Sequence, residues 1–380
     1  MSAELSTGES AIYDRQIRLW GSSAQMRIKS GTVLVRGVSA TTAEICKNVV
    51  LAGSNLVIVD DRLVDSTTIN FLITLEADYI KLHEGMTVGE ATALACRRLN
   101  EHPSVKWASQ VDLISRVASC DAAVCSFPVV DFHTIRSVAN QVRQKGKSFF
   151  CIVESSTCSW AFSDFGASHT VESHTAPLKR DERTGDRKSD NRVLEYAFSS
   201  FEEWLSAGFE SNMMISKPYF PFNEVLFVRL LMEFHAREDG ASAPSPKRSR
   251  KSDSTKTSFR SFVETRLTEL EKSSPKLGKI IQPNISSLIE LLDQMERSIS
   301  IPALPHMAAI HGALISQEIV KFVTKRDVPL VNQIVLNPSD CGAIVLKTPM
   351  SLSSRVVAGG HDSEDDIELV NGQMTEQVLE

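Results

Sequence analysis

A strand followed by a glycine, a helix and an acidic strand end can hold a nucleotide, and this chain carries a degraded form of that pattern. The loop after the apolar run 32–37 reads GVSATT (37–42). In the intact GxGxxG pattern, three glycines let the backbone approach phosphate, and an acid about 20 residues on binds ribose. Ser39 and Thr42 replace two glycines, leaving Gly37 and, at the ribose position, Asp60. The sequence therefore predicts a vestigial site that holds no cofactor.

The segment YDRQIRLWG (13–21) precedes this loop and carries two closely spaced arginines. On a helix, Arg15 and Arg18 lie near each other, while Ile17 and Trp20 share another face. A guanidinium is well suited to phosphate oxygens because it is planar and permanently charged. A short amphipathic helix is also an ordinary packing element with a solvated face, so the residues alone leave both interpretations open.

The cysteines of the sequence do not indicate a nucleophile or a metal site. Cys158, in SSTCSW, is the cysteine that we considered as a thioester nucleophile. Neither an adjacent base nor a helix N-terminus favours its thiolate, so we expect a buried structural thiol. The seven cysteines include no pair spaced for zinc, so we predict no metal site. Their odd number, without a CxxC pair, suits a reducing compartment.

The elements that must position these residues alternate between strand and helix. Apolar runs at 55–61, 121–126 and 148–153 are typical of buried strands, and helices are predicted at 42–52, 88–99 and 134–144. This alternation indicates βαβ units and a doubly wound parallel sheet. A helix at 306–325 and strands at 333–336 and 343–346 restore the same character near the end. The predicted fold class is α/β and Rossmann-like.

Between these parts the pattern changes. We predict a Rossmann-like domain from residues 13–170 and 300–348, interrupted by a mostly helical insertion at 171–299. The insertion has helical periodicity at 222–237, 259–272 and 285–299 and a low-complexity basic loop at 241–256, which we expect to be disordered. Residues 1–12 and the acidic tail 349–380 are also expected to be disordered.

Charge and hydropathy exclude two classes of partner. Lys and Arg number 41 against 47 Asp and Glu, a net charge of −6, which argues against nucleic acid as the main ligand. No apolar run approaches the roughly 18 residues that a membrane span requires. The amino end, MSAELSTGES, lacks the basic and apolar regions of a secretory signal. We therefore expect an intracellular protein that binds neither nucleic acid nor membrane.

Several segments together resemble a known family. YDRQIRLWG, the stretch 33–61 and the closing helix region IPALPHMAAIHGALISQEIVKFVTKRDVPL (301–330) resemble the amino-terminal, inactive adenylation half of ubiquitin-like-protein activating enzymes, a ThiF-like family. NFLI (70–73) stands where the family has a Gln-Phe-Leu-like segment. The resemblance covers about 13–170 and 300–348. In its length and in the modest size of its insertion, the chain is similar to the smaller, Aos1-like subunits of the SUMO-activating enzymes.

The resemblance implies that the catalytic residues and binding sites are distributed over two chains. The family's active half keeps an Asp-x-Asp turn, an Asn-x-Asn-Arg-Gln segment and a catalytic cysteine domain, which this chain lacks. Mg-ATP, the thioester cysteine and the tail of a SUMO-like modifier would then lie on a larger, catalytic Uba2-like partner, and this chain would be inactive alone. By the same resemblance, Arg15 would act in trans at the partner's ATP site, and Arg18 would support its helix.

Three alternatives stay open. The chain could be the regulatory subunit of the neddylation-activating enzyme, a non-catalytic scaffold, or an NAD(P)-binding oxidoreductase with an unusual loop. For location, PSPKRSRK (244–251) is typical of a nuclear import signal and equally of a solvated charge run. The family's nuclear role favours the nucleus, with some protein in the cytoplasm.

Overall fold

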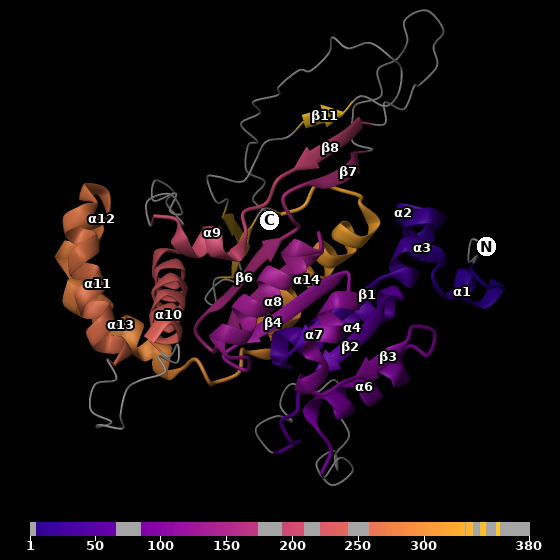
Figure 1. Ribbon diagram of the computed structural model, residues 1–380, viewed down its shortest axis with the longest axis horizontal. Helices are drawn as coiled ribbons and strands as arrows, with labels where there is room; N and C mark the ends of the chain where they lie inside the picture. Colours follow the sequence, from indigo (N-terminus) through magenta and orange to yellow (C-terminus); the bar gives the residue numbers. More distant parts are fainter. Residues whose placement is uncertain are drawn as a thin grey trace, which may run out of the picture.

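A twisted sheet of eight strands forms the centre of the molecule (Figure 1). The computed structural model describes residues 5–65, 85–173, 192–208, 221–241, 258–330, 332–336, 343–346 and 355–357. The strand order is β10-β9-β6-β5-β4-β1-β2-β3, so strands that are neighbours in space are mostly not neighbours in the sequence.

Five neighbouring strands of this sheet are parallel. β1 (Thr32–Arg36) pairs with β2 (Asn55–Val59) on one side and with β4 (Ala122–Phe127) on the other. β3 (Val105–Trp107) continues beyond β2, and β5 (Ser148–Glu154) beyond β4. Strand order therefore reverses between β1 and β4, the kind of position at which open α/β sheets form ligand crevices. The predicted α/β, Rossmann-like class is confirmed.

The other three strands extend the sheet in antiparallel fashion, which the sequence did not predict. β6 (Ser159–Asp164) forms a hairpin with β5, β9 (Gln333–Leu336) pairs with β6, and β10 (Ala343–Leu346) pairs with β9. The bounds of β9 and β10 match the predicted strands. One sheet thus contains strands from both 13–170 and 300–348.

One face of the sheet is covered by three helices. α4 (Ala40–Ala52), α6 (Val88–Leu99) and α14 (Pro305–Thr324) contribute their apolar sides to a core that contains Val33 and Val35 of β1. Because successive strand residues point to opposite faces, alternate positions of β1 belong to this core. α14 packs along α4, where a Cβ at Gly312 would lie 2.5 Å from Glu44 Cβ and 3.1 Å from the Thr41 carbonyl oxygen.

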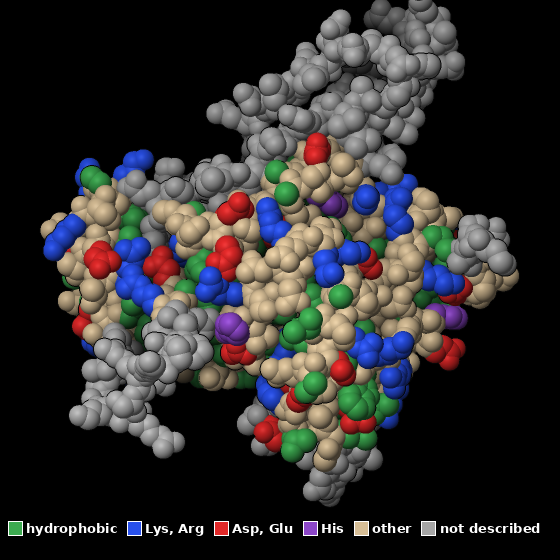
Figure 2. Space-filling view, viewed as in Figure 1, with side chains coloured by type: hydrophobic (Ala, Val, Ile, Leu, Met, Phe, Trp, Pro, Cys, Tyr) green, Lys and Arg blue, Asp and Glu red, His purple; other side chains and the backbone are tan. Residues whose placement is uncertain are grey.

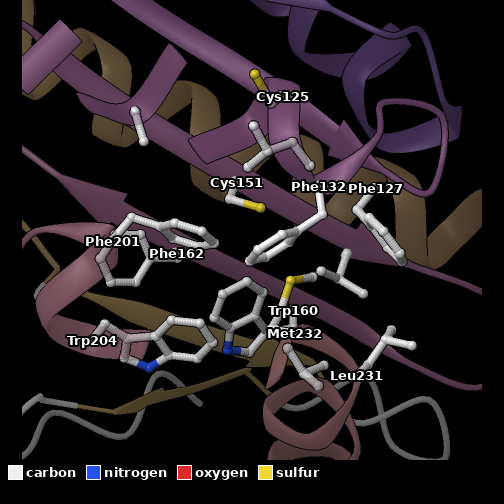
Figure 3. Close-up of a cluster of buried hydrophobic side chains, with 14 of the residues drawn as sticks. Cys125, Phe127, Phe132, Cys151, Trp160, Phe162, Phe201, Trp204, Leu231 and Met232 are labelled. Atoms are coloured by element: carbon white, nitrogen blue, oxygen red, sulfur yellow. The ribbon is translucent and has the colours of Figure 1, made fainter. Parts of the chain in front are cut away.

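The opposite face carries a larger core that contains Leu34. α7 (Leu113–Ser119), α8 (Phe132–Gln144), α9 (Phe201–Ser206) and α10 (Phe222–Ala241) cover it. Figure 3 shows its aromatic centre, which includes Phe127, Phe132, Trp160, Phe162, Phe201 and Trp204. Rings at these spacings add edge-to-face and stacked contacts to the area that they bury.

Further helices pack beyond α10. α11 (Phe259–Ser273), α12 (Pro275–Ile281) and α13 (Ile285–Arg297) lie at the left of Figure 1. Their apolar residues join the same core through Phe262 and Leu292. The predicted helical periodicity in this region is therefore confirmed. The basic loop expected at 241–256 lies outside the described residues, apart from Ala241 at the end of α10.

A small second sheet departs from the prediction of a helical insertion and a disordered tail. β7 (His169–Ser173) pairs with β8 (Arg192–Tyr196), and β11 (Arg355–Val357) pairs with β8 on its other side. Both pairings are antiparallel, and β11 lies far from β8 in the sequence, so local composition gave no sign of this sheet. Within the tail 349–380, only these three residues of β11 are described.

The amino end also departs from the expected disorder. α1 (Thr7–Ile12) begins with a capping box, in which Ser6 and Glu9 each accept a hydrogen bond from the other's backbone N–H. Glu9 is buried and pairs with Lys29. Ser-x-x-Glu at 6–9 is a recognised helix-start signal that the sequence analysis overlooked.

The described helices include none that is long and apolar enough to cross a membrane. In the same part of the chain, no three His, Cys, Asp or Glu side chains are grouped so that they could hold a metal ion.

Candidate functional site

The loop between β1 and α4 is packed against its neighbours. Gly37 has φ +81°, a left-handed conformation that favours glycine, and its N–H donates to the Val59 carbonyl at 3.0 Å. A Cβ at this position would lie 2.6 Å from Val130 and 2.9 Å from Val129, in the loop after β4. The first glycine of the degraded pattern is thus kept for a turn and a close approach.

Ser39 and Thr42, which replace the other two glycines, bond to each other. The Ser39 N–H donates to Thr42 Oγ1 at 2.7 Å, and the Thr42 N–H donates to Ser39 Oγ at 3.4 Å. The Thr42 hydroxyl also donates to the Gly37 carbonyl at 3.0 Å. This is a capping box, and it closes the loop on itself.

A carboxylate of the same chain lies at the N-terminus of α4. Glu154, the last residue of β5, is 4% exposed, and Oε2 accepts from the Thr41 N–H at 3.0 Å. Burial raises the pKa of its carboxyl, and hydrogen bonds from Thr41, Ser39 and the Ala40 backbone oppose the rise. The positive end of a helix dipole favours such an anion, as it would favour phosphate.

All four N–H groups that begin α4 therefore have acceptors. Glu154 accepts from the N–H groups of residues 40 and 41, Ser39 Oγ accepts from that of Thr42, and Thr42 Oγ1 accepts from that of the N-cap residue Ser39. These are the donors that a phosphate at a helix N-terminus would need. The residues present do not fit a nucleotide phosphate here unless Glu154 is displaced. Sequence reasoning missed Glu154, although an acid that ends the apolar strand SFFCIVE was a visible signal.

Asp60 is likewise engaged inside the loop. It is 1% exposed, and Oδ2 accepts from the Val38 N–H and from Arg62 Nη2, both at 2.7 Å. Arg62 also donates to the Val38 carbonyl. Gly37, Ser39, Thr42 and Asp60 thus lie together in the structure, as parts of a self-bonded turn.

The arginine-bearing segment lies at the other end of α4. α2 (Asp14–Trp20) follows Tyr13, whose buried ring packs against Gly53, the residue after α4. A helix of α4's length spans about 20 Å. The structure therefore does not bring Arg15 together with the loop of its own chain.

The two arginines of α2 differ in their contacts. Arg18 is exposed and pairs with Asp14 at 3.0 Å. Arg15 is also exposed, and it forms no hydrogen bond or ion pair with any residue that the structure describes. Figure 2 shows Lys and Arg side chains over the part of the surface where Figure 1 places α2 and α3 (Ser22–Ser30). Arg15 is free to meet an anion outside this chain.

Cys158 is completely buried, and burial raises the pKa of its thiol. The neighbouring Glu224 shifts that pKa in the same direction. A thiol in this environment stays protonated and cannot act as a nucleophile at neutral pH. The expected structural role is in keeping with this burial.

No family model matches the chain. SUMO-activating enzyme subunit 1B-1 of Arabidopsis thaliana is 26% identical over 352 residues, which cover 90% of this chain and 97% of the relative. SUMO-activating enzyme subunit 1 of Danio rerio is 44% identical over 77 residues, or 20% of this chain and 22% of the relative.

Among solved structures, the crystal structure of PaaA has a TM-score of 0.48 at 12% sequence identity, with 91% of this chain and 76% of that chain covered. The fold assignment rests on the strand order itself. Along nearly its whole length, the chain is similar to subunit 1 of the SUMO-activating enzyme.

Proposed function

We propose that this chain is the non-thioester-forming subunit of a heterodimeric SUMO-activating enzyme and that it is inactive alone. Its relatives are named as subunit 1, 1A or 1B-1 of that enzyme. The observation that carries the proposal is the contrast between the two ends of α4: Glu154 occupies the place of a phosphate at one end, while Arg15 has no described partner at the other. Mg-ATP, the thioester cysteine and the SUMO-like modifier are assigned to the larger, catalytic subunit.

In this reaction the carboxylate at the modifier's C-terminus attacks the α-phosphorus of ATP. An oxygen–phosphorus bond forms, the bond to the β-phosphate oxygen breaks, and pyrophosphate leaves with its electron pair. Negative charge grows on the phosphate oxygens as this bond breaks. A guanidinium from the neighbouring subunit stabilises that charge, as arginine fingers do in phosphoryl transfer. Arg15 supplies this cation, and Arg18, paired with Asp14, supports the helix that presents it.

Substitution of Arg15 by alanine tests this role. ATP–pyrophosphate exchange by the complex should fall by about 10²–10³-fold at saturating ATP, the loss typical of one transition-state donor. The fold and the heterodimer should persist, because an exposed side chain contributes little stability. Arg15→Lys should recover only part of the rate, since an ammonium group cannot make a two-pronged contact.

The control is Arg260→Ala, which removes an exposed arginine of α11 that pairs with Glu290 and Asp293. That variant should exchange at the wild-type rate. Wild-type exchange in an assembled Arg15→Ala complex would refute the assignment. If exchange depended on a different ubiquitin-like modifier, such as that of the neddylation system, the subunit role would stand and the SUMO assignment would be wrong.

A further inference from the structure

We propose that Gln25 and Asn100 are positioning residues that fix α2, and with it Arg15, against the carboxyl end of α4. The inference rests on the proposed function of Arg15 and extends it to two residues that were not among the predicted site residues. Neither side chain lies in the self-bonded loop, and both come from elements outside α2.

The last turn of α4 contains carbonyl oxygens that can accept hydrogen bonds from outside the helix. The Gly53 N–H donates to the Val50 carbonyl at 2.9 Å, and the Ser54 N–H donates to the Val49 carbonyl at 3.1 Å. This pair of bonds, with Gly53 at φ +95°, is a Schellman motif. It leaves the carbonyls of residues 51 and 52 without intrahelical donors.

Side-chain amides donate hydrogen bonds to these two carbonyls and to that of Val50. Gln25 Nε2 donates to the Ala52 carbonyl at 2.9 Å, and Gln16 Nε2 donates to the Leu51 carbonyl at 3.2 Å. Asn100, at the end of α6, donates through Nδ2 to the Val50 carbonyl at 2.9 Å. Three amide groups from three elements therefore meet the last turn of one helix.

Two of these amides also form hydrogen bonds with side chains at the ends of α2. Asn100 Nδ2 donates its second hydrogen to the Tyr13 hydroxyl at 2.8 Å, immediately before α2 begins. Gln25 Oε1 accepts from Trp20 Nε1 at 2.9 Å, at the last residue of α2. Arg15 lies between these two attachment points. The placement of its backbone is therefore set by Asn100 and Gln25 at the two ends of α2, with Gln16 of α2 itself bonded to the Leu51 carbonyl between them.

The Gln25 attachment is the better protected of the two. Gln25 is fully buried, and both of its polar atoms are bonded, so no alternative partner is at hand. Its loss would leave the Ala52 carbonyl and the Trp20 indole N–H unpaired and would free the end of α2. A shift of about 1 Å in a positioned group can cost on the order of 10²-fold in rate, so a loosened α2 should weaken the action of Arg15.

A double-mutant cycle distinguishes positioning from simple packing. We would reconstitute the heterodimer with its larger subunit and measure modifier-dependent ATP–pyrophosphate exchange for Gln25→Leu, Arg15→Ala and the double variant. Gln25→Leu should lower kcat by about tenfold with little change in the KM for ATP. In the Arg15→Ala background it should cause no further loss, because the group that it positions is already gone.

Two companion variants complete the test. Tyr13→Phe keeps the ring against Gly53 and removes only the oxygen that Asn100 bonds, so it should give a smaller loss of kcat, again absent in the Arg15→Ala background. Ser54→Ala removes a buried hydrogen bond to the Gly31 carbonyl at the same end of α4 without touching α2, and it should exchange like wild type. If Gln25→Leu prevents assembly, the Tyr13→Phe cycle decides the question.

The possible failures are distinct. Wild-type exchange in assembled Gln25→Leu and Tyr13→Phe complexes, or losses that multiply with that of Arg15→Ala, would overturn the positioning role and leave Arg15 in place. Wild-type exchange in Arg15→Ala alone would instead overturn the proposed function on which the inference rests.

Discussion

Single residues in this chain bond backbone N–H groups of the loop and helix start at 37–42, which a bound phosphate would need. Glu154 bonds the first N–H groups of α4, and Asp60 bonds the backbone of its own loop. The sequence predicted that the loop is degraded, because Ser39 and Thr42 stand where glycines belong. It could not predict Glu154 as the substitute anion, since residues 41 and 154 meet only when β5 lies next to β4 and β4 next to β1.

His311, in α14, provides a pH-dependent test of the packing between α14 and the sheet. It is fully buried with Nδ1 2.6 Å from Ser159 Oγ, and burial lowers its pKa from 6.5 to about 3. Between these values the unfolded chain binds a proton that the folded chain does not. The free energy of unfolding should therefore fall as the pH drops from 6.5 toward 3, by up to about 1.4 kcal/mol per pH unit from this residue.

His311→Asn cannot be protonated, so it should flatten this dependence in urea unfolding measured across that pH range. His169, whose pKa burial lowers to about 4, should retain its own contribution. His306→Asn, at an exposed position of the same helix, provides the matched histidine substitution for comparison. Identical slopes in His311→Asn and wild type would contradict the assignment.

At the scale of elements, the contact between α4 and Tyr13 depends on a glycine. Gly53 has φ +95°, and a Cβ there would lie 2.8 Å from the Tyr13 ring. Gly146, after α8, also has positive φ, at +63°, but its Cβ would meet nothing within 4 Å. Gly146→Ala should therefore cost only the backbone term, about 1–2 kcal/mol.

Gly53→Ala should cost that amount plus the displacement of the ring, an overpacking penalty of about 1–3 kcal/mol. Urea unfolding of both variants measures the difference between them. Equal losses of stability would mean that the Tyr13 ring moves aside freely and that α2 is less firmly attached than the hydrogen bonds suggest.

Elements with local signals were predictable, and elements defined by distant partners were not. α6, β9 and β10 have the predicted bounds. The signals that determine such bounds, namely hydrophobic periodicity, helix caps and nearby Pro or Gly, all lie within a few residues of each element. β7, β8 and β11 were missed, since short strands are fixed by pairing partners elsewhere in the chain. The same reason hid the attachment of α2, whose amide contacts bring residues 25 and 100 to the end of α4.

At the scale of the whole molecule, we predict an obligate heterodimer. Leu19 is 78% exposed on the helix that carries Arg15, so the larger subunit should cover it when Arg15 reaches the ATP site. The two subunits should elute together in size-exclusion chromatography, with more than about 2,000 Å² buried in total, as permanent complexes have. Leu19→Asp should reduce the co-eluting fraction. A monodisperse single chain that activates a modifier unaided would contradict the proposal.

Location is a second prediction at this scale. We propose that the chain is mainly nuclear, with some in the cytoplasm, because PSPKRSRK (244–251) has the composition of an import signal. Alanine at Lys247, Arg248, Arg250 and Lys251 together should lower the nuclear fraction in fluorescence imaging. An unchanged distribution would assign import to the larger subunit.

The order of strands in the sheet also determines how long β6 waits for its partner strand during synthesis. β6 pairs with β9, yet Asp164 and Gln333 stand about 170 positions apart in the chain. At typical translation speeds of 5–20 residues per second, roughly 8–34 s pass before the second strand exists. Throughout that interval β6, whose six residues all end up buried, is a sheet edge open to other chains. Each nascent chain must therefore be shielded until its last strands emerge, and slower translation of the intervening helices lengthens its exposure.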